Sequence, residues 1–426
     1  MADKSTSQCY EAVCSAQGIK MNSNILNALE ETAITGNLTL NLTGNRLKNI
    51  QRLGDPDVLA LSKCLQNSGH VTDLDMRYNN ISDEGAGHLA DLLQQPENST
   101  LRVLNLMFND IQMKGAEVLA SSLQCNSRLL SLKLSGNKIG NSGAMYLVSM
   151  LQVNNTLQEL ELSECDLATQ SVIALSIMLK NNTALRSVDI SRPLLFSHQE
   201  EWVVHFSEML AVNCSLVELH LGKTGLTDTG MERLSEGLRL NHHLRYLDLH
   251  CNRVSRDGAC HLAKVLTQNM TLEIINLSFN RIEDEGATYL SKAITWSGCV
   301  LKELSVKSNN IRSEGLLSLA QAMKKNKTLT HIYIWGNHPE ELACEAFRDL
   351  ISSGRLPPEQ TDVRAYEVDG QVFLAEVFHS LRKQINCTDC TRSDTCSDLD
   401  TTRPSAADMS SDVALSPEAT FPLHIK

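Results

Sequence analysis

Aromatic residues and long apolar runs are scarce in this 426-residue chain. Aromatic residues make up only 4% of it, and nowhere do about eighteen apolar residues follow one another, the length that a membrane-spanning helix needs. The N-terminus begins Met-Ala-Asp-Lys and has no apolar stretch of the kind found in a signal peptide. We therefore expect a protein that is not secreted and makes no membrane contact.

Enzyme motifs and positive charge are also lacking. The sequence has no Gly-x-x-x-x-Gly-Lys-Ser/Thr loop, no Gly-x-Ser-x-Gly elbow and no His-Glu-x-x-His pair. Cys387, Cys390 and Cys396 lie close together, but no fourth Cys or His has a spacing suited to zinc. The net charge of −12 disfavours contact with nucleic-acid phosphates. These absences predict no enzyme activity, no metal, no cofactor and no direct nucleic-acid binding.

The chain does contain one pattern repeated at a period of 28 residues. In one copy it runs Leu101, Leu104, Leu106, Asn109 and Ile111, and each position recurs 28 residues later. A degenerate copy at Leu40 precedes ten copies whose first strand residues are Val71, Leu101, Leu129, Leu157, Leu185, Leu216, Leu244, Leu272, Leu301 and Leu329. Such a period is typical of a solenoid, in which each repeat packs on its neighbours.

Each element of the repeat has a physical reason. Alternate side chains of a strand face opposite sides, so Leu104 and Leu106 should point into the core and Asn105 to the concave surface. The Asn at position nine should satisfy backbone groups where the chain leaves the strand. The residues expected to act as helix N-caps, each followed two positions later by Gly, are Asp83, Asn141, Asp228, Asp284 and Ser313.

A second Asn column stands three residues before most strand leucines, as at Asn126, Asn154 and Asn213. Asn tolerates the left-handed conformation that ends many helices, which is the role we expect here. Several of these residues begin Asn-x-Ser/Thr sequons, but without a signal peptide we expect no glycosylation.

This pattern resembles the ribonuclease-inhibitor-like class of leucine-rich repeats, whose repeats are of this length. The resemblance covers roughly three quarters of the chain. It implies an α/β leucine-rich-repeat solenoid, or horseshoe, of about 11 repeats with a parallel concave sheet and convex α-helices.

The chain divides into four predicted segments. Residues 1–36 form an N-terminal helical cap around Ile25 and Leu29, and residues 37–354 form the solenoid. Residues 355–386 form a C-terminal cap, with a hairpin turning at Asp369 and Gly370 and then a helix from Leu374 to Ile385. Residues 387–426, acidic and rich in Ser and Thr, are expected to be disordered.

Two further features depart from the regular repeat. An insertion from Pro193 to Trp202, which also carries Phe196 and His198, lengthens one step to 31 residues; we favour a tolerated bulge over a contact loop. Thirteen cysteines are scattered mostly one per repeat, including Cys125 and Cys214, and most are expected to be buried, reduced thiols.

Function is sought at the variable strand positions of the concave face. Those positions contain eight carboxylates and one lysine, and Glu161 should lie about 4.8 Å from Asp189, where the like charges repel. A basic partner would relieve this repulsion; alternatively the face is simply solvated, with Arg102, Arg186, Arg245 and Lys302 as flanking counterions. Exposed aromatic residues near both ends suit an interface, with Tyr333 and Trp335 expected to be the more exposed. The predicted partner-binding residues are Asp75, Tyr78, Phe108, Glu159, Glu161, Asp189, Glu218, Tyr246, Asp248, Phe279, Tyr333 and Trp335.

The sequence therefore predicts a monomeric, non-catalytic scaffold that binds a basic protein. The segment from Tyr366 to Val377 also resembles the cap of a small vertebrate-type member of the class, which implies presence in the cytoplasm and in the nucleus or nucleolus, and a role in stem or germ cells. Two alternatives stay open. The repeats resemble those of the Ran GTPase-activating protein, and the acidic horseshoe resembles, less closely, a ribonuclease inhibitor.

Overall fold

The computed structural model describes residues 6–36, 38–44, 51–66, 70–95, 100–195 and 200–381. Residues 1–386 form one unit and residues 387–426 another. The predicted tail, Ile385, Phe196 and His198 lie outside the described residues.

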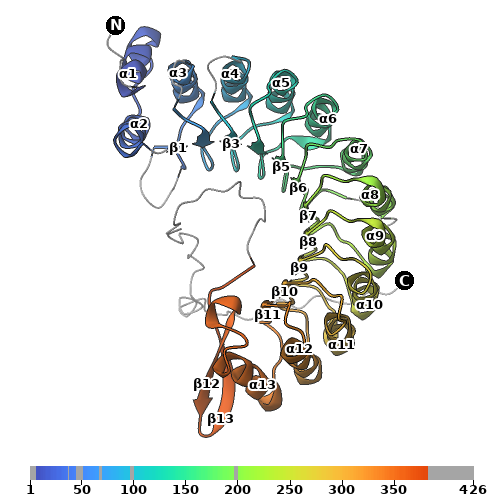
Figure 1. The fold of residues 1–426 in the computed structure, drawn as a ribbon. Coiled ribbons are helices and arrows are strands. Elements are labelled where there is room, and N and C mark those ends of the chain that lie inside the picture. The colour runs from blue at the N-terminus through green and yellow to red at the C-terminus, as the bar shows by residue number, and fades with distance from the viewer. Residues whose placement is uncertain are drawn as a thin grey trace, which may run out of the picture. The chain divides into compact units, whose positions relative to one another are not determined.

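One parallel sheet of eleven strands runs through the first unit, with its strands paired in the order of the sequence. This confirms the predicted solenoid of about eleven repeats (Figure 1). The strands are β1 (Thr39–Asn41), β2 (Asp73–Asp75), β3 (Val103–Asn105), β4 (Ser131–Lys133), β5 (Glu159–Glu161), β6 (Ser187–Asp189), β7 (Glu218–His220), β8 (Tyr246–Asp248), β9 (Ile274–Asn276), β10 (Glu303–Ser305) and β11 (His331–Tyr333).

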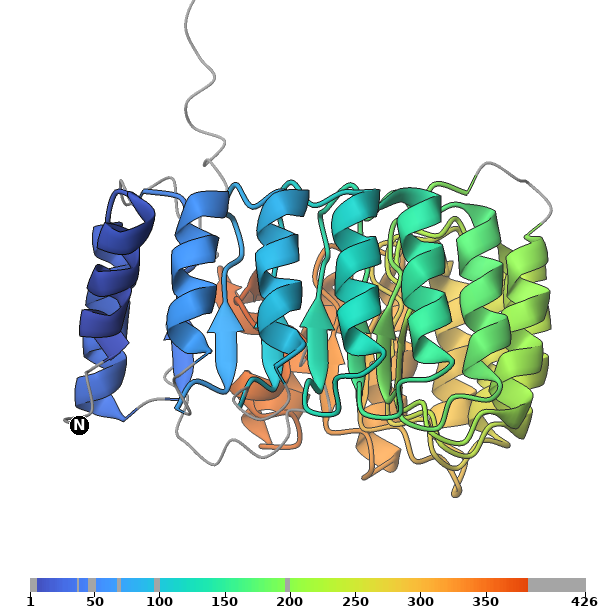
Figure 2. The ribbon, with the colours of Figure 1, turned by 90° about the horizontal axis from the view of Figure 1, so that it is seen from above.

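Helices form the outer layer, and the strands line the inner side of the curve (Figures 1 and 2). Within the described ranges, no helix is long and apolar enough to cross a membrane. The helices are α1 (Thr6–Gln17), α2 (Ser23–Thr35), α3 (Asp55–Leu65), α4 (Asp83–Leu93), α5 (Met113–Leu123), α6 (Gly140–Leu151), α7 (Thr169–Leu179), α8 (Glu201–Val212), α9 (Asp228–Leu240), α10 (Arg256–Leu266), α11 (Glu283–Ile294), α12 (Ser313–Lys325), α13 (Glu341–Ser352) and the short 3-10 helix η2 (Pro358–Gln360).

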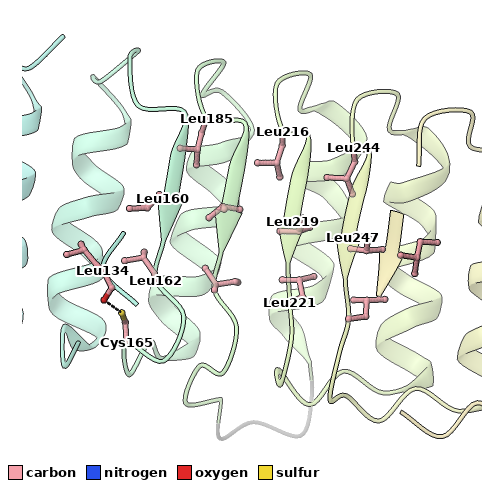
Figure 3. Close-up of a cluster of buried hydrophobic side chains, with 14 of the residues drawn as sticks. Leu134, Leu160, Leu162, Cys165, Leu185, Leu216, Leu219, Leu221, Leu244 and Leu247 are labelled. Atoms are coloured by element: carbon pink, nitrogen blue, oxygen red, sulfur yellow. Dashed lines mark hydrogen bonds between the residues drawn. The ribbon is translucent and has the colours of Figure 1, made fainter. Parts of the chain in front are cut away.

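The core lies between these layers and is built from the repeated leucines. Leu104 and Leu106 are fully buried, as predicted from strand alternation. Figure 3 shows the same stacking in later repeats, where Cys165 replaces the position-nine Asn and its thiol donates to the carbonyl oxygen of Leu134 at 3.1 Å. Each buried aliphatic side chain stabilises the array by about 1.5–3 kcal/mol before entropy is considered.

The position-nine asparagines join consecutive repeats, which confirms their structural role. Asn109 donates to the carbonyl oxygens of Leu106 in its own repeat and Met76 in the preceding one, both at 3.0 Å. Its side-chain oxygen accepts from the Ile81 amide at 3.1 Å. One side chain thus pairs three buried backbone groups.

The reason expected for the second Asn column was wrong. Asn213 has φ −69° and ψ 131°, which is extended rather than left-handed. Its side-chain oxygen accepts from the amides of Ser215 and Leu216, and its amide donates to the carbonyl oxygen of Leu179 in the preceding repeat. Hydrogen bonding to the backbone, not tolerance of positive φ, therefore explains Asn at this position.

Four of the five predicted N-cap residues act on the next repeat instead of their own, namely Asp83, Asn141, Asp228 and Asp284. Among the residues described, the buried Ser313 hydroxyl caps neither helix. Asp228 is the first residue of α9, whose N-cap is Thr227. One Asp228 carboxylate oxygen accepts from the amides of Ser255 and Gly258, at the start of α10. A Cβ at Gly258 would lie 2.5 Å from that oxygen, so the position requires glycine. The carboxylate caps a helix one repeat further along the chain.

Both ends of the solenoid are covered. Helix α2 buries Ile25 and Leu29 against the first repeat, in the predicted cap region. At the other end, β12 (Val363–Val368) and β13 (Gln371–Glu376) form a hairpin around Asp369 and Gly370. The helix predicted from Leu374 was wrong over the described residues, because Leu374, Ala375 and Glu376 belong to β13 and pair with β12, and residues 377–381 are not helical.

The repeat that contains the insertion makes the same helix-capping contact with the next repeat, but through a different residue. Trp202 is buried in α8 and packs edge-to-face on Phe206, so it is a core residue. Glu200 takes the place of the capping aspartate, accepting from the amide and hydroxyl of Thr227 at 2.6 and 2.7 Å. The described end of the insertion is thus built into the fold.

The cysteine prediction was only partly right. Every described cysteine is a free thiol. Cys125 and Cys214, however, are exposed, because they adjoin the turn asparagines on the surface; the five buried thiols are Cys14, Cys64, Cys165, Cys299 and Cys344.

Candidate binding surface on the concave face

Strand register brings the predicted acidic residues into rows across the concave face. Glu161 pairs directly with Asp189, as expected, and Asp189 pairs with His220 on the following strand. On the other side of Glu161 lies Lys133. The fifth strand position thus forms a row in which a basic side chain stands at each end of an acidic pair.

Lys133 neutralises some of the charge in this acidic row. Its ammonium lies 2.9 Å from a Glu159 oxygen and 2.8 Å from a Glu161 oxygen. Burial alone would raise the pKa of Glu159, but the Lys133 charge and a hydrogen bond from Ser131 hold it below its ordinary value. Burial and the neighbouring Asp189 leave the pKa of Glu161 above its ordinary value. The two glutamates therefore share one cation unequally.

His220 supplies the corresponding cation on β7. Its imidazole lies 3.7 Å from a Glu218 oxygen and 3.5 Å from an Asp248 oxygen. Burial opposes protonation of His220, but these carboxylates outweigh it and raise its pKa to about 10. Burial also raises the pKa of Asp248, yet its contacts with His220 and His250 hold that pKa below its ordinary value. His220 is protonated at neutral pH.

The five carboxylates of this region, which we call the central acidic cluster, outnumber the three basic side chains that contact them, Lys133, His220 and His250. The cluster consists of Glu159, Glu161, Asp189, Glu218 and Asp248. It retains negative charge, but with less repulsion than the bare sequence suggested. Two of the four expected flanking counterions do not serve it, since Arg245 and Lys302 both pair with Glu273, at 2.8 and 3.0 Å.

The structure corrects which of the acidic residues a partner can reach. Glu218 is fully buried and Asp248 nearly so, because His220 and neighbouring side chains enclose them. Glu159, Glu161, Asp189 and Asp75 remain partly exposed. The accessible acidic surface is therefore centred on β5 and β6, next to Lys133.

The aromatic residues predicted to be the more exposed are buried, and those predicted to be partly covered are exposed. Tyr246 and Tyr333, expected to be exposed, are only 3% and 2% exposed, because they cluster with Ile274 and Leu381. Trp335 is partly buried against the core. Leu381 comes from the segment that follows the hairpin, a contact that no repeat pattern could indicate.

Tyr78, Phe108 and Phe279, expected to lie partly beneath loops, are instead 40%, 37% and 51% exposed. Each has a positive φ, between 54° and 62°, which is uncommon for bulky residues. The Tyr78 and Phe108 rings are stacked, with centroids 4.8 Å apart. These two residues form an apolar patch, the Tyr78–Phe108 stack, at the end of the second and third strands.

Lys133 and His220 were missed as residues of this surface. Both were visible in the fifth-position column, directly beside Glu161 and Asp189, so strand adjacency was the signal that identified them. Among the residues whose placement is described, no group of three or more His, Cys, Asp or Glu could hold a metal ion.

Comparisons with known proteins agree with the repeat architecture. A family model described as "Leucine Rich repeat" matches residues 67–90, 97–120, 125–148, 153–176, 212–235, 240–262, 268–291 and 299–320. The solved structure of an internalin from Listeria monocytogenes is 16% identical and covers 86% of this chain and 96% of its own, with a TM-score of 0.41, too low to support any conclusion.

Among curated proteins, human leucine-rich repeat-containing protein 34 is 53% identical over 381 residues, covering 88% of this chain and 82% of its own length. The mouse protein of the same name is 54% identical over 194 residues, or 46% of this chain and 47% of its own. With the eleven-stranded solenoid, these matches show that the chain belongs to the leucine-rich-repeat family, within the group named leucine-rich repeat-containing protein 34.

Proposed function

We propose that this chain is a non-catalytic scaffold that binds a basic protein on its concave face. Solenoid repeats commonly provide extended concave surfaces for binding. The observation that carries the proposal is the central acidic cluster, whose five carboxylates contact only three basic side chains of the described residues, Lys133, His220 and His250. Cations from a partner would complete this charge balance and would accelerate association as well as stabilise the complex.

The partly exposed carboxylates around Lys133 support a binding position for the partner on β5 and β6. Glu161 and Asp189 face each other across adjacent strands, and an incoming Lys or Arg can reach both. Because Lys133 already occupies the Glu159 side, the partner's cation is expected to bind on the Asp189 side.

The test compares three full-length proteins in quantitative affinity purification with mass spectrometry. They are the wild type, the concave variant Glu161→Gln with Asp189→Asn, and a control carrying Glu232→Gln with Glu236→Gln. The control makes the same charge change at exposed positions of α9. We expect basic proteins recovered with the wild type and the control to fall at least about tenfold with the concave variant.

Circular dichroism and melting first establish that all three proteins fold alike. Recovered partners should also dissociate as salt rises, because salt screens exposed charges. Recovery of the same basic proteins by the wild type, the concave variant and the control would overturn the proposal.

A further inference from the structure

The turns that connect each helix to the next strand form one edge of the solenoid, and asparagines join these turns to one another. The side-chain amide of Asn241 donates to the carbonyl oxygen of Asn213 at 3.3 Å, and that of Asn269 donates to the carbonyl oxygen of Asn241 at 2.8 Å. In the view of Figure 2 the helices stand side by side with their ends aligned. Residues that flank these asparagines therefore lie in a row along the edge.

Large apolar side chains are exposed along this row in four consecutive repeats. They are Val212, Leu240, Met270 and Trp296, each more than half exposed. The side chains of Met270 and Trp296 both approach Gly298, where an added Cβ would lie 3.7 Å from the Met270 methyl carbon and 2.8 Å from the Trp296 indole nitrogen. Single exposed apolar residues are common on protein surfaces, but a row of them on adjoining turns is typical of a contact surface.

Positive charge lies beside the apolar row. The last turns of α9, α10, α11 and α12 and the turn after α12 carry the exposed basic residues Arg239, Lys264, Lys292, Lys324, Lys325 and Lys327. Over the part of the chain that the structure describes, only Lys324 of this set forms a salt bridge, with Asp349 at 3.9 Å. The helix dipole also favours basic side chains near helix C-termini, but it does not explain the apolar row next to them. We call the apolar row and these basic residues together the amphipathic edge.

The corresponding edge of the preceding repeats differs in charge. Val153, in the turn after α6, is exposed too, but the last turns of α5, α6 and α7 contain no basic residue. Lys180, which follows α7, is paired with Glu208 at 2.7 Å. A continuous run of basic residues therefore begins only at α9, so it is not a general requirement of the repeat.

An anionic lipid surface has the complementary chemistry. Proteins that bind the surface of a bilayer insert apolar side chains among the headgroups and hold Lys and Arg against anionic lipids. Tryptophan is enriched at this depth, and Trp296 is the most exposed of the three tryptophans. Because the ends of the helices are aligned, their last turns can meet a flat surface together. The net charge of −12 does not prevent this contact, because salt screens charges more than about 8–10 Å away.

We infer that the amphipathic edge binds an anionic lipid surface, with Leu240, Met270 and Trp296 inserted among the headgroups. Contact of this kind needs no membrane-spanning helix, so it revises the expectation of no membrane contact that followed from the lack of long apolar runs. It goes beyond the proposed function, because it uses an edge of the solenoid and not Glu161 and Asp189 on the concave face. A basic partner and a lipid surface would then be bound by different faces of one molecule.

The test is cosedimentation of the full chain with vesicles, either of phosphatidylcholine alone or of phosphatidylcholine and phosphatidylserine in a two-to-one ratio. We expect at least about tenfold tighter binding to the mixed vesicles, and loss of that difference at high salt. Leu240→Ser with Trp296→Ser should weaken binding to the mixed vesicles at least about tenfold, because it removes inserted side chains. Lys264→Gln with Lys292→Gln should weaken it by a similar factor, because it removes charges that face the lipid.

Matched controls make the same kinds of change at the opposite ends of the helices. Met113→Ser with Leu342→Ser removes two exposed apolar side chains at the starts of α5 and α13. Lys114→Gln with Arg312→Gln removes two exposed charges at the starts of α5 and α12. Both controls should bind the mixed vesicles as the wild type does. Because every substituted side chain is exposed, circular dichroism and melting should show all variants folded.

Tryptophan fluorescence reports insertion separately from binding. Trp202 is buried and Trp335 is partly buried, so a blue shift of the emission on addition of mixed vesicles should come from Trp296. Trp296→Phe should keep most of the binding and lose the shift.

No binding of the wild type to the mixed vesicles would overturn the inference and would leave an acidic protein as the chemistry that fits the edge. Binding that is unchanged in both edge variants, that falls equally in the controls, or that occurs without the fluorescence shift would overturn it as well. None of these results bears on the proposed function, which the comparison with Glu161→Gln and Asp189→Asn decides.

Discussion

The two halves of the concave face use the same repeat positions in opposite ways. Around β4 and β5, Lys133, Glu159 and Glu161 form ion pairs that remain partly open to solvent. Around β7 and β8, His220 lies between Glu218 and Asp248 in an enclosed site next to the buried apolar cluster of Tyr246, Ile274, Tyr333 and Leu381. Equivalent positions in a repeat therefore do not have equivalent environments, and charge alone does not define the accessible surface.

Removing the cation from the enclosed half should have the largest effect. We expect His220→Gln to lower the free energy of unfolding by about 3 kcal/mol, because it leaves the buried Glu218 without its histidine cation and leaves His250 as the remaining basic contact of Asp248. Urea denaturation of the purified variant measures this. A loss below about 1 kcal/mol would show that the two carboxylates are far better solvated than their burial indicates.

The same site predicts a pH dependence somewhat smaller than the effect of the substitution. The pKa of His220 is raised to about 10, so its stabilising charge is fully present below the unfolded value of about 6.5 and is lost as the pH rises towards 10. The stability difference between wild type and His220→Gln should therefore shrink between pH 7 and pH 10. Because groups away from His220 titrate alike in both proteins, a constant difference over this range would contradict the assignment.

The equivalent substitution in the more exposed half, Lys133→Gln, should lower the free energy of unfolding by less. Lys133→Gln removes the cation shared by Glu159 and Glu161, but water can solvate these partly exposed carboxylates. We expect the free energy of unfolding to fall by about 1 kcal/mol, measured by the same urea denaturation. A cost equal to that of His220→Gln would remove the distinction between the two halves.

The smallest effects are expected at the exposed aromatic residues. Phe279→Gly relieves a positive φ at an exposed side chain, so we expect a gain of about 0.5–1 kcal/mol. Phe108→Gly relieves a similar φ but loses the stack on Tyr78, worth about 0.5–1.5 kcal/mol, and should show no net gain. Thermal melting of both variants compares the two, and a gain in Phe108→Gly would mean that the stack contributes nothing.

Local periodicity predicted the solenoid well because the same short-range contacts, strand alternation and backbone hydrogen bonding, recur in every repeat. The core positions of Leu104 and Leu106 and the backbone pairing of Asn109 follow from strand alternation and hydrogen-bonding needs. The role of Asp228 was assigned to the wrong helix, since its partners lie 27 to 30 residues away in the next repeat. Contacts between repeats are regular but require the register to be known.

The candidate site was harder to predict for a different reason. The pairing of Glu161 with Asp189 was predicted from the residues at the fifth strand position. The positions of Lys133 and His220 beside them could have been predicted in the same way. The burial of Tyr246 and Tyr333 depends on Leu381, which lies outside the repeats and obeys none of their periodicity. Exposure at a concave position can be read from the sequence only where nothing else folds over it.

The carboxylate that caps the following helix also bears on how such an array changes over evolutionary time. Because Asp228 serves Ser255 and Gly258, insertion or loss of a complete unit preserves this contact between repeats. Small changes of length within a unit are also accommodated, since Asp284 accepts from Gly315 at a spacing of 31 residues and Asp83 accepts from Gln112 at a spacing of 29. The lengthened step before α8 keeps the contact too, since Glu200 meets Thr227 at the same spacing of 27 residues. The length of a unit can therefore vary by a few residues as long as the carboxylate still reaches the first amides of the next helix.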